Sequence, residues 1–419
     1  LAPYYIVVDA EDPSIVFYER DPDERCIPAS TMKIMTCILT LEQVEDLDET
    51  VVITRQAASM KETNSLMHVL AGETLTIRQL LYGLMLHSGN DAAMTLANYV
   101  AGSVEAFAEM ANAKAAELGM AGTHFLNASG AFRGGQYSTA RDMAVLTVYA
   151  LKNEMFRTLM STARYTIEPN DVRKQPMEMV NSNRLISDDP DSDCFSALCV
   201  GGKTGSTARG GDCLVAVGEL DGARVIVVLI GADDTNHRDA NKRMPRVFKN
   251  GKFLIEYTLE NDYAAVSPSA LGYAYEDEVA LAGLAAPLPV AAWFDESAFV
   301  RLPKTLGEQL AADPSKIEVE TRLDSGLAAA KAGDIVGSIS CSFAGRALFE
   351  GDLVAKADAA PTPAPTLALP ESTPEPAPDS EIGGILSSAD LGVYLFGGLS
   401  ALLTVSLIVL IALNLRKRS

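Results

Sequence analysis

Histidine is scarce in this sequence: only four of the 419 residues are histidine. The four stand at positions His68, His87, His124 and His237. Their spacing matches no zinc-ligand pattern, and neither does the spacing of the six cysteines, which are Cys26, Cys37, Cys194, Cys199, Cys213 and Cys341. The sequence therefore predicts no metal site and no other cofactor. It leaves open whether the cysteines form disulfides or remain free buried thiols.

Basic residues are also in the minority, with 34 Lys and Arg against 55 Asp and Glu and a net charge of -21. Nucleic acid is excluded as the main partner, because phosphate binding requires a basic face. Hydrophobic residues, by contrast, make up 48% of the chain. This composition allows at least one large core, and the length predicts two or three domains.

Charge is absent altogether between Leu391 and Leu415. As a helix this segment would be roughly 37 Å long, enough to cross a hydrocarbon core of about 30 Å. We predict a transmembrane helix there, followed by a cytoplasmic basic tail at 416–419. The alternative is a buried core helix. Because the chain begins with Leu1 rather than Met, we also expect that a secretion signal has been removed, with everything before Leu391 outside the cytoplasm.

The remaining chain divides by composition. Residues before about 258 mix strands with amphipathic helices, one of which Ser103 is expected to cap, and Asp221-Gly222 predicts a β-hairpin. Short alternating segments between 265 and 355 predict a small all-β domain. A Pro-rich stretch, 359–380, is expected to be extended. The predicted organisation is a catalytic domain at 1–260, a β domain at 261–357, a linker at 358–390, the membrane helix at 391–415 and the tail.

The segment "PASTMKIMTC", residues 28–37, raises the question of catalysis. Pro28 suits a helix start, and residues three apart share a helix face, so Ser30 and Lys33 are expected to be neighbours. A lysine can take a proton only when it is neutral, and burial or a second nearby cation lowers its pKa. Alone, the pattern fits equally well a helix cap followed by a surface lysine.

Two further segments contain hydroxyl, amide and lysine side chains that could act together with Ser30 and Lys33. "LMLHSGNDAA" places Ser88-Gly89-Asn90 between two helical runs, and "CVGGKTGSTARGG" places Lys203-Thr204-Gly205 on a predicted Gly-flanked strand. Taken singly, the first could be an ordinary helix junction and the second a strand end with an exposed lysine. Taken together and in this order, Ser-x-x-Lys, Ser-x-Asn and Lys-Thr-Gly resemble the signature of penicillin-binding proteins and serine β-lactamases.

The sequence resembles the low-molecular-weight D-alanyl-D-alanine carboxypeptidases in particular, over roughly residues 4–260 and more weakly beyond. The resemblance implies an α/β (α+β) catalytic domain of the penicillin-binding and β-lactamase type, followed by a small β domain. It implies that Ser30 attacks the D-Ala-D-Ala peptide bond, with Lys33 as base. Ser88 would relay the proton to the leaving D-alanine, and Asn90 would bind substrate or orient Lys33. The backbone N–H groups of Ser30 and Ser206 would form the oxyanion hole.

The resemblance also implies a substrate-binding strand. Lys203 and Thr204 would hold the terminal carboxylate of the substrate, and Gly205 would leave room for the substrate beside the strand. Arg238 matches an arginine that assists in carboxylate binding. The implied partners are peptidoglycan stem peptides and, as covalent inhibitors, β-lactam antibiotics.

Other functions use the same motifs. Class A β-lactamases need an additional glutamate for deacylation, and the sequence has none between Glu117 and Glu154. A peptidoglycan endopeptidase would use the same three motifs, so the sequence separates it poorly from a carboxypeptidase. A non-catalytic, membrane-tethered wall-binding scaffold is the remaining alternative, and the intact motifs argue against it.

Overall fold

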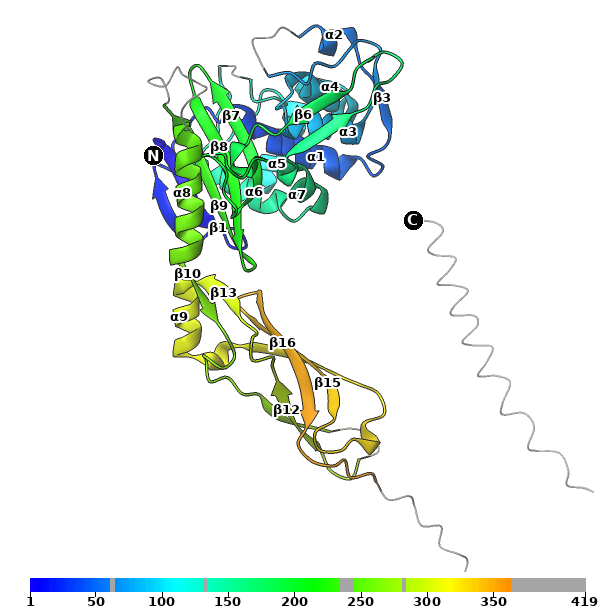
Figure 1. Ribbon diagram of the computed structural model, residues 1–419, viewed down its shortest axis with the longest axis vertical. Coiled ribbons are helices and arrows are strands. Elements are labelled where there is room, and N and C mark those ends of the chain that lie inside the picture. The colour runs from blue at the N-terminus through cyan, green and yellow to red at the C-terminus, as the bar shows by residue number, and fades with distance from the viewer. Residues whose placement is uncertain (61–64, 132–133, 234–244, 281–283, 363–419) are drawn as a thin grey trace, which may run out of the picture. The chain divides into compact units, whose positions relative to one another are not determined.

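The computed structural model describes residues 1–60, 65–131, 134–233, 245–280 and 284–362 (Figure 1). Its first region is built on a five-stranded sheet with the order β2-β1-β9-β8-β7, in which every pair is antiparallel. The strands are β1 (Tyr4–Asp9), β2 (Val16–Arg20), β7 (Cys199–Thr207), β8 (Gly211–Leu220) and β9 (Ala223–Ala232). The central strands are buried almost throughout, because helices cover both faces of the sheet.

One face of this sheet packs against α8 (Arg246–Asn261), whose apolar side chains include Leu254, Ile255 and Leu259. The other face packs against a helical group. This group contains α1 (Lys33–Gln43), α2 (Arg55–Ala58), α3 (Ile77–Met85), α4 (Asn90–Ala101), α5 (Val104–Glu117), α6 (Ala140–Ala150) and α7 (Glu154–Ser161). The predicted α+β architecture is confirmed for this region.

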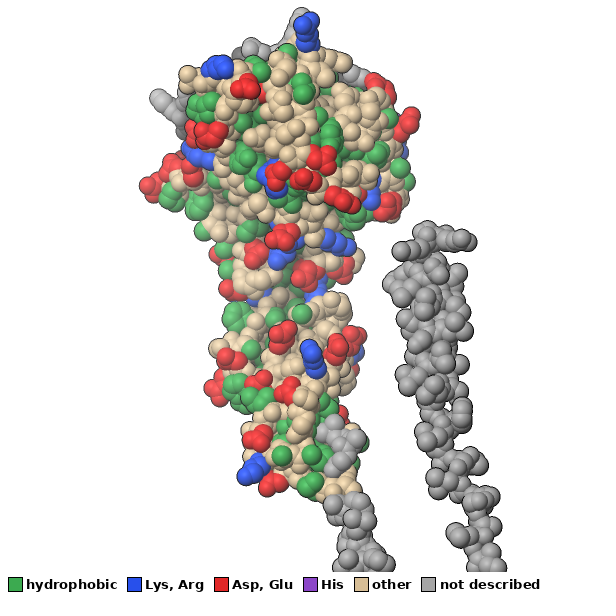
Figure 2. Space-filling view, turned by 90° about the vertical axis from the view of Figure 1, so that its right-hand side faces the viewer, with side chains coloured by type: hydrophobic (Ala, Val, Ile, Leu, Met, Phe, Trp, Pro, Cys, Tyr) green, Lys and Arg blue, Asp and Glu red, His purple; other side chains and the backbone are tan. Residues whose placement is uncertain are grey.

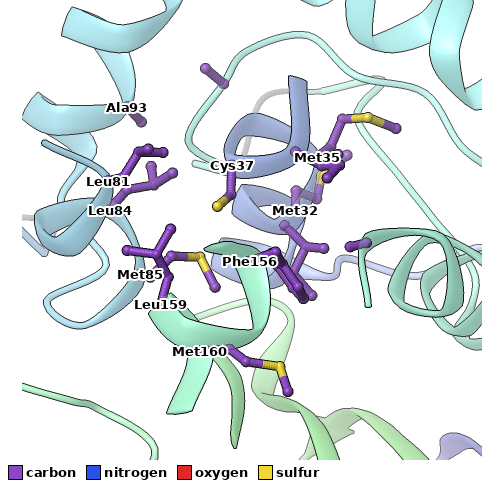
Figure 3. Packing of buried hydrophobic residues seen from close by; sticks show 14 of the residues in the cluster. Met32, Met35, Cys37, Leu81, Leu84, Met85, Ala93, Phe156, Leu159 and Met160 are labelled. Carbon is purple, nitrogen blue, oxygen red and sulfur yellow. The ribbon is translucent and has the colours of Figure 1, made fainter. Parts of the chain in front are cut away.

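Helix α1 lies at the centre of the helical group. Its first eight residues, 33–40, are all buried, as expected of a helix that is covered on every side. Figure 3 shows the apolar side chains that surround it, contributed by α3, α4 and α7. They include Leu81, Leu84, Ala93, Phe156 and Leu159. This packing fixes the start of α1, and with it the segment that carries Ser30 and Lys33.

Two local predictions are confirmed. The Ser103 side chain accepts a hydrogen bond from Ala106 N at the start of α5. Asp221 and Gly222 turn the chain between β8 and β9 with φ of 47° and 82°, which are the positive angles of a tight hairpin turn. Two short ribbons, β3 (Thr50–Val52) with β4 (Thr74–Thr76) and β5 (Arg164–Ile167) with β6 (Met177–Val180), complete this region.

The second region begins at β10 (Tyr263–Val266), which pairs with β13 (Val300–Pro303). Its main sheet has the order β11-β12-β16-β15-β14. These strands are β11 (Glu276–Val279), β12 (Leu288–Trp293), β14 (Glu318–Leu323), β15 (Ile335–Phe343) and β16 (Arg346–Ala355). The sheet has one apolar face, which forms a separate core.

The prediction that this region is all β is wrong in one element. Helix α9 (Lys304–Ala312) follows β13, and its Leu310 is completely buried in the core. Leu306 and Leu310 are four residues apart and so share one helix face. The segment is only nine residues long, and this short apolar spacing is a weaker signal than the alternating strands around it.

The compact unit of the chain runs from Leu1 to Thr362, five residues beyond the predicted end of the β domain at 357. The Asp358 carboxylate accepts a hydrogen bond from Ala332 N, and Ala359 N donates to Ala330 O. These bonds hold the segment against the second region. Within the described residues no helix combines the length and the apolar character that a membrane crossing requires. The rest of the predicted linker, 363–390, the predicted membrane helix at 391–415 and the basic tail lie outside the described residues.

A buried polar cluster joins the two regions. Asp9, at the end of β1, is 1% exposed, and its carboxylate accepts hydrogen bonds from both terminal nitrogens of Arg346 on β16. The Tyr263 hydroxyl also donates to Asp9, over 2.7 Å. Acidic side chains are spread over the visible face of the molecule (Figure 2), in keeping with the net charge of -21.

Candidate active site

Ser30 lies on a short 3-10 turn, Ala29–Met32, that leads directly into α1. Its neighbour Ala29 has φ of 52°, a left-handed conformation that is uncommon for a residue with a side chain. Gly130 packs against this residue, because a Cβ at Gly130 would lie 2.0 Å from Ala29 O. Backbone strain of this kind gathers at functional sites, and here it sets the position of Ser30.

Lys33 is completely buried, with 0% of its surface exposed. Its Nζ lies 2.9 Å from Ser30 Oγ, 2.7 Å from Asn90 Oδ1 and 2.6 Å from Ser129 O. The expected contact between Ser30 and Lys33 is therefore present. The reading of Lys33 as a surface lysine is excluded.

Burial lowers the pKa of Lys33 well below its ordinary value, and the nearby Lys203 lowers it further. Lys203, 1% exposed, has its own pKa lowered by burial to about 7. Removing a lysine from water penalises its charged form. The two causes expected from the sequence, burial and a second cation, are both present at Lys33. Such a lysine can be neutral near pH 7 and can accept a proton.

The Ser88-Gly89-Asn90 turn joins α3 to α4, and Ser88 has φ of 56°. The Ser88 hydroxyl is buried and has no hydrogen-bond partner among the described residues. Asp91 holds the turn in place: its carboxylate accepts hydrogen bonds from Met67 N and Val69 N, over 2.8 and 3.1 Å. A buried hydroxyl without a partner is costly, so its presence beside the cleft indicates a functional role.

Strand β7 carries Lys203, Thr204 and Gly205 at the edge of the sheet. Thr204 Oγ1 forms a hydrogen bond of 2.6 Å with Ser182 Oγ. Gly205 passes directly beside the segment that carries Ser30, because a Cβ there would lie 2.9 Å from Ser30 N and 3.0 Å from Pro28 O. Glycine is therefore required at this position for the strand to approach Ser30 so closely.

A cleft of about 230 Å³ unites these elements. Ser30, Ser88, Thr204, Gly205 and Ser206 line it directly. Lys33, Asn90 and Lys203 are buried beside it. The structure thus brings together eight of the nine residues singled out from the sequence. The ninth, Arg238, lies outside the described residues.

Three contributors to the site were missed by the sequence reading. The carbonyl of Ser129 contacts Lys33, and its loop is shaped by Asn127, whose Oδ1 accepts from Ser129 N and Gly130 N. Asp91 positions the Ser88 turn, and Ser182 contacts Thr204. Every residue has a backbone carbonyl, so a contact made by the Ser129 carbonyl cannot be predicted from residue type. The position of Asp91 next to Asn90, by contrast, was a usable signal.

Histidine and cysteine also occur at the cleft. His87 lines it, and burial followed by the neighbouring His68 lowers the pKa of His87, so this imidazole is neutral near pH 7. Cys213 lines the cleft as well, but burial raises its pKa to about 12, so the thiol does not compete as a nucleophile at neutral pH. All six cysteines are free and buried. Among the described residues no group of three or more His, Cys, Asp or Glu side chains could hold a metal ion.

Comparison with known proteins agrees with this geometry. The family model described as D-alanyl-D-alanine carboxypeptidase matches residues 1–234. The chain is 34% identical over 238 residues to the D-alanyl-D-alanine carboxypeptidase DacF of Bacillus subtilis, covering 56% of this chain and 58% of the relative. It is also 34% identical over 236 residues to a D-alanyl-D-alanine carboxypeptidase of Streptomyces strain K15, covering 54% of this chain and 79% of the relative.

Solved structures extend the likeness to both regions. A variant of the Streptomyces K15 DD-transpeptidase superposes with a TM-score of 0.54 at 29% identity, covering 61% of this chain and 96% of that one. The D-alanyl-D-alanine carboxypeptidase DacD from Francisella tularensis superposes with a TM-score of 0.52 at 25% identity, covering 86% of this chain and 94% of its own.

Proposed function

The chain belongs to the D-alanyl-D-alanine carboxypeptidase family of serine peptidases, and from that premise we propose that it removes the terminal D-alanine from peptidoglycan stem peptides through an acyl-enzyme on Ser30. The observation that carries the proposal is the 2.9 Å contact between Ser30 Oγ and the completely buried Lys33. The matched region is little more than half the length of the Bacillus relative.

The chemistry begins at Ser30. Neutral Lys33 takes the Ser30 hydroxyl proton as Oγ attacks the carbonyl carbon of the D-Ala-D-Ala bond. Ser88, whose hydroxyl is uncommitted, relays that proton from Lys33 to the nitrogen of the departing D-alanine, which leaves Lys33 neutral again. Water then hydrolyses the ester on Ser30, with Lys33 again as the base. Asn90 holds the Lys33 amine in place throughout.

Strand β7 supplies the electrostatic part of the mechanism. The close approach of Gly205 to Ser30 N supports an oxyanion hole formed by the backbone N–H groups of Ser30 and Ser206. Thr204 lines the cleft, and Lys203 lies buried beside it. We assign these two residues, with Arg238, to the terminal carboxylate of the substrate.

Two related activities share this site. A DD-endopeptidase would use the same residues on a cross-linked peptide, and a β-lactamase would add a group that activates the deacylating water. We further propose that the chain acts outside the cytoplasm and is tethered to the membrane by residues 391–415. The apolar composition of that segment supports this proposal.

The decisive experiment is a short pulse of penicillin followed by intact-protein mass spectrometry. One drug mass should appear on the protein and decay over minutes or longer, which corresponds to a deacylation barrier of roughly 20–21 kcal/mol. The slow step is expected because the leaving group of penicillin stays attached and blocks water. Ser30→Ala should prevent labelling.

Ser65→Ala is the matched control, because Ser65 lines the same cleft without a lysine contact, and it should still be labelled. Labelling that persists in Ser30→Ala would overturn the nucleophile assignment. Release within one second, with steady consumption of penicillin, would favour a β-lactamase. Release of free D-alanine from a pentapeptide stem, compared with cleavage of a cross-linked dimer, separates carboxypeptidase from endopeptidase.

A further inference from the structure

The second region carries a cavity of about 610 Å³, well away in sequence from the motifs of the first region. It lies on the face of the main sheet opposite to the apolar core, because its polar lining residues alternate along β15 and β16 with buried ones such as Cys341 and Leu353. The lining includes Trp293, Asp352 and Arg322. This face is therefore a polar surface on a rigid support.

Strand pairing arranges the side chains of this cavity in rows. Trp293 on β12 stands opposite Asp352 on β16. Asp352 stands opposite Ser338 on β15, and Ser338 stands opposite Arg322 on β14. Neighbouring strands are about 4.8 Å apart, so one aromatic ring, one carboxylate, one hydroxyl and one guanidinium follow each other across four strands.

A second row runs parallel to the first. Glu350 on β16 stands opposite Ser340 on β15, and Ser340 stands opposite Glu320 on β14. Carboxylates accept hydrogen bonds and hydroxyls both donate and accept them. No salt bridge joins Arg322 to any of these carboxylates in the part of the chain that the structure describes. The charged groups therefore keep their capacity for an external ligand.

Trp293 is the one tryptophan of the sequence, and 58% of it is exposed. An exposed indole presents a large flat face with a negative quadrupole. That face attracts the partly positive C–H groups of a sugar ring. Trp293 stands at one end of the polar row, where a ring stacked on it would bring its hydroxyls toward Asp352.

We propose that this face binds the glycan strand of peptidoglycan, a chain of N-acetylated amino sugars whose lactyl carboxyl groups are made neutral by their amide bonds to the stem peptides. Sugar hydroxyls donate and accept hydrogen bonds, which matches the alternation of carboxylate, hydroxyl and guanidinium on the sheet. The excess of carboxylates repels an anionic polymer. The identity of the glycan rests on the proposed function, since the stem peptides cleaved at Ser30 are attached to that glycan.

The test uses the intrinsic fluorescence of Trp293, which reports on this face alone because the full chain holds no other tryptophan. The probe is a series of neutral N-acetylglucosamine oligosaccharides, because removing the stem peptides from peptidoglycan would leave a lactyl carboxylate on every second sugar. A saturable change in emission is expected, and Ser30→Ala should give the same curve. No change in emission, or a change that disappears in Ser30→Ala, would overturn the proposal.

Sedimentation with insoluble chitin, a neutral polymer of N-acetylglucosamine, gives a second readout. Trp293→Ala should weaken binding by about tenfold, as expected for a lost stacking contact, and Asp352→Asn should weaken it less. Phe253→Ala removes an aromatic side chain of similar exposure, 56%, from α8 and should leave binding unchanged. Equal losses in Trp293→Ala and Phe253→Ala would overturn the proposal.

Two further outcomes separate this inference from others. A fluorescence response to poly-lysine but not to the glycan would overturn it in favour of a cationic partner. Penicillin labelling is measured on the same samples. A protein that is labelled at Ser30 but does not bind the glycan contradicts the inference alone, whereas a protein that binds the glycan without being labelled contradicts only the proposed function.

Discussion

The candidate active site of the first region and the cavity of the second region place their charged groups in opposite ways. In the first region, Lys33 and Lys203 are buried almost completely beside the nucleophile. In the second region, carboxylates and Arg322 face outward around an exposed tryptophan. Removal from water changes what a charged group does chemically, because its pKa shifts. A charged group in contact with water is suited to binding a ligand. The extent of burial therefore distinguishes the active-site cleft from the proposed binding face of the second region.

The strongest test of this contrast is Lys33→Met. The substitution keeps most of the buried volume and removes the base. We expect the rate of Ser30 acylation by penicillin to fall by about 10²- to 10⁴-fold, measured by stopped-flow or by mass spectrometry at timed intervals. Lys249→Met changes an exposed lysine on α8 and should leave the rate unchanged. A fall below threefold in Lys33→Met would mean that another group activates Ser30.

Arg346→Met tests the buried polar cluster that joins the two regions. It would leave the Asp9 carboxylate buried without its cation, and such a loss costs about 3–5 kcal/mol of unfolding free energy. Urea denaturation measures the change. Arg301→Met is the matched control, because Arg301 pairs with Asp221 in an ion pair that stays partly in contact with water, with side-chain exposures of 23% and 43%. It should cost less than about 1 kcal/mol. Equal losses of unfolding free energy in the two variants would contradict the expectation that the more deeply buried ion pair contributes more to stability.

Lys203→Ala should act on both rate and pH dependence. Loss of the carboxylate contact costs about 2–4 kcal/mol, or roughly 30- to 1000-fold in turnover. The charge of Lys203 lowers the pKa of Lys33, so removing it raises that pKa, and Lys33 becomes neutral only at higher pH. The acid limb of the acylation profile should therefore move to higher pH. A shift to lower pH would contradict the coupling, and an equal loss on an amidated substrate would contradict the carboxylate contact.

The smallest effects come from one substitution made in each region. Gly130→Ala places a methyl group 2.0 Å from Ala29 O at φ of +76°, which should cost about 1–3 kcal/mol and slow acylation. Gly307→Ala, in α9, meets only Val266 Cγ2 at 3.4 Å and should stabilise the protein by up to about 1 kcal/mol. Thermal unfolding and penicillin labelling measure both variants. The same sign of change in both would contradict the contrast.

The sequence predicted most of the site, because the three motifs are local and each lies on one element. Ser30 and Lys33 are one helical turn apart, so their contact follows from spacing alone. The contact of Lys33 with Ser129 O depends on a loop nearly 100 residues away, and it follows only from tertiary packing. Helix α9 was missed for a related reason, since its helical character depends on the burial of Leu310.

The three contacts of Lys33 have a consequence for where its protons point. A neutral amine carries two N–H bonds and one lone pair. Asn90 Oδ1 and Ser129 O can only accept hydrogen bonds, and both lie within 2.7 Å of Nζ. They therefore take the two N–H bonds and leave the lone pair directed at the Ser30 hydroxyl. When a third proton is added to Lys33, an N–H bond replaces the lone pair, and Ser30 Oγ must accept a hydrogen bond from it. A single proton on Lys33 therefore converts Ser30 from a hydrogen-bond donor into an acceptor.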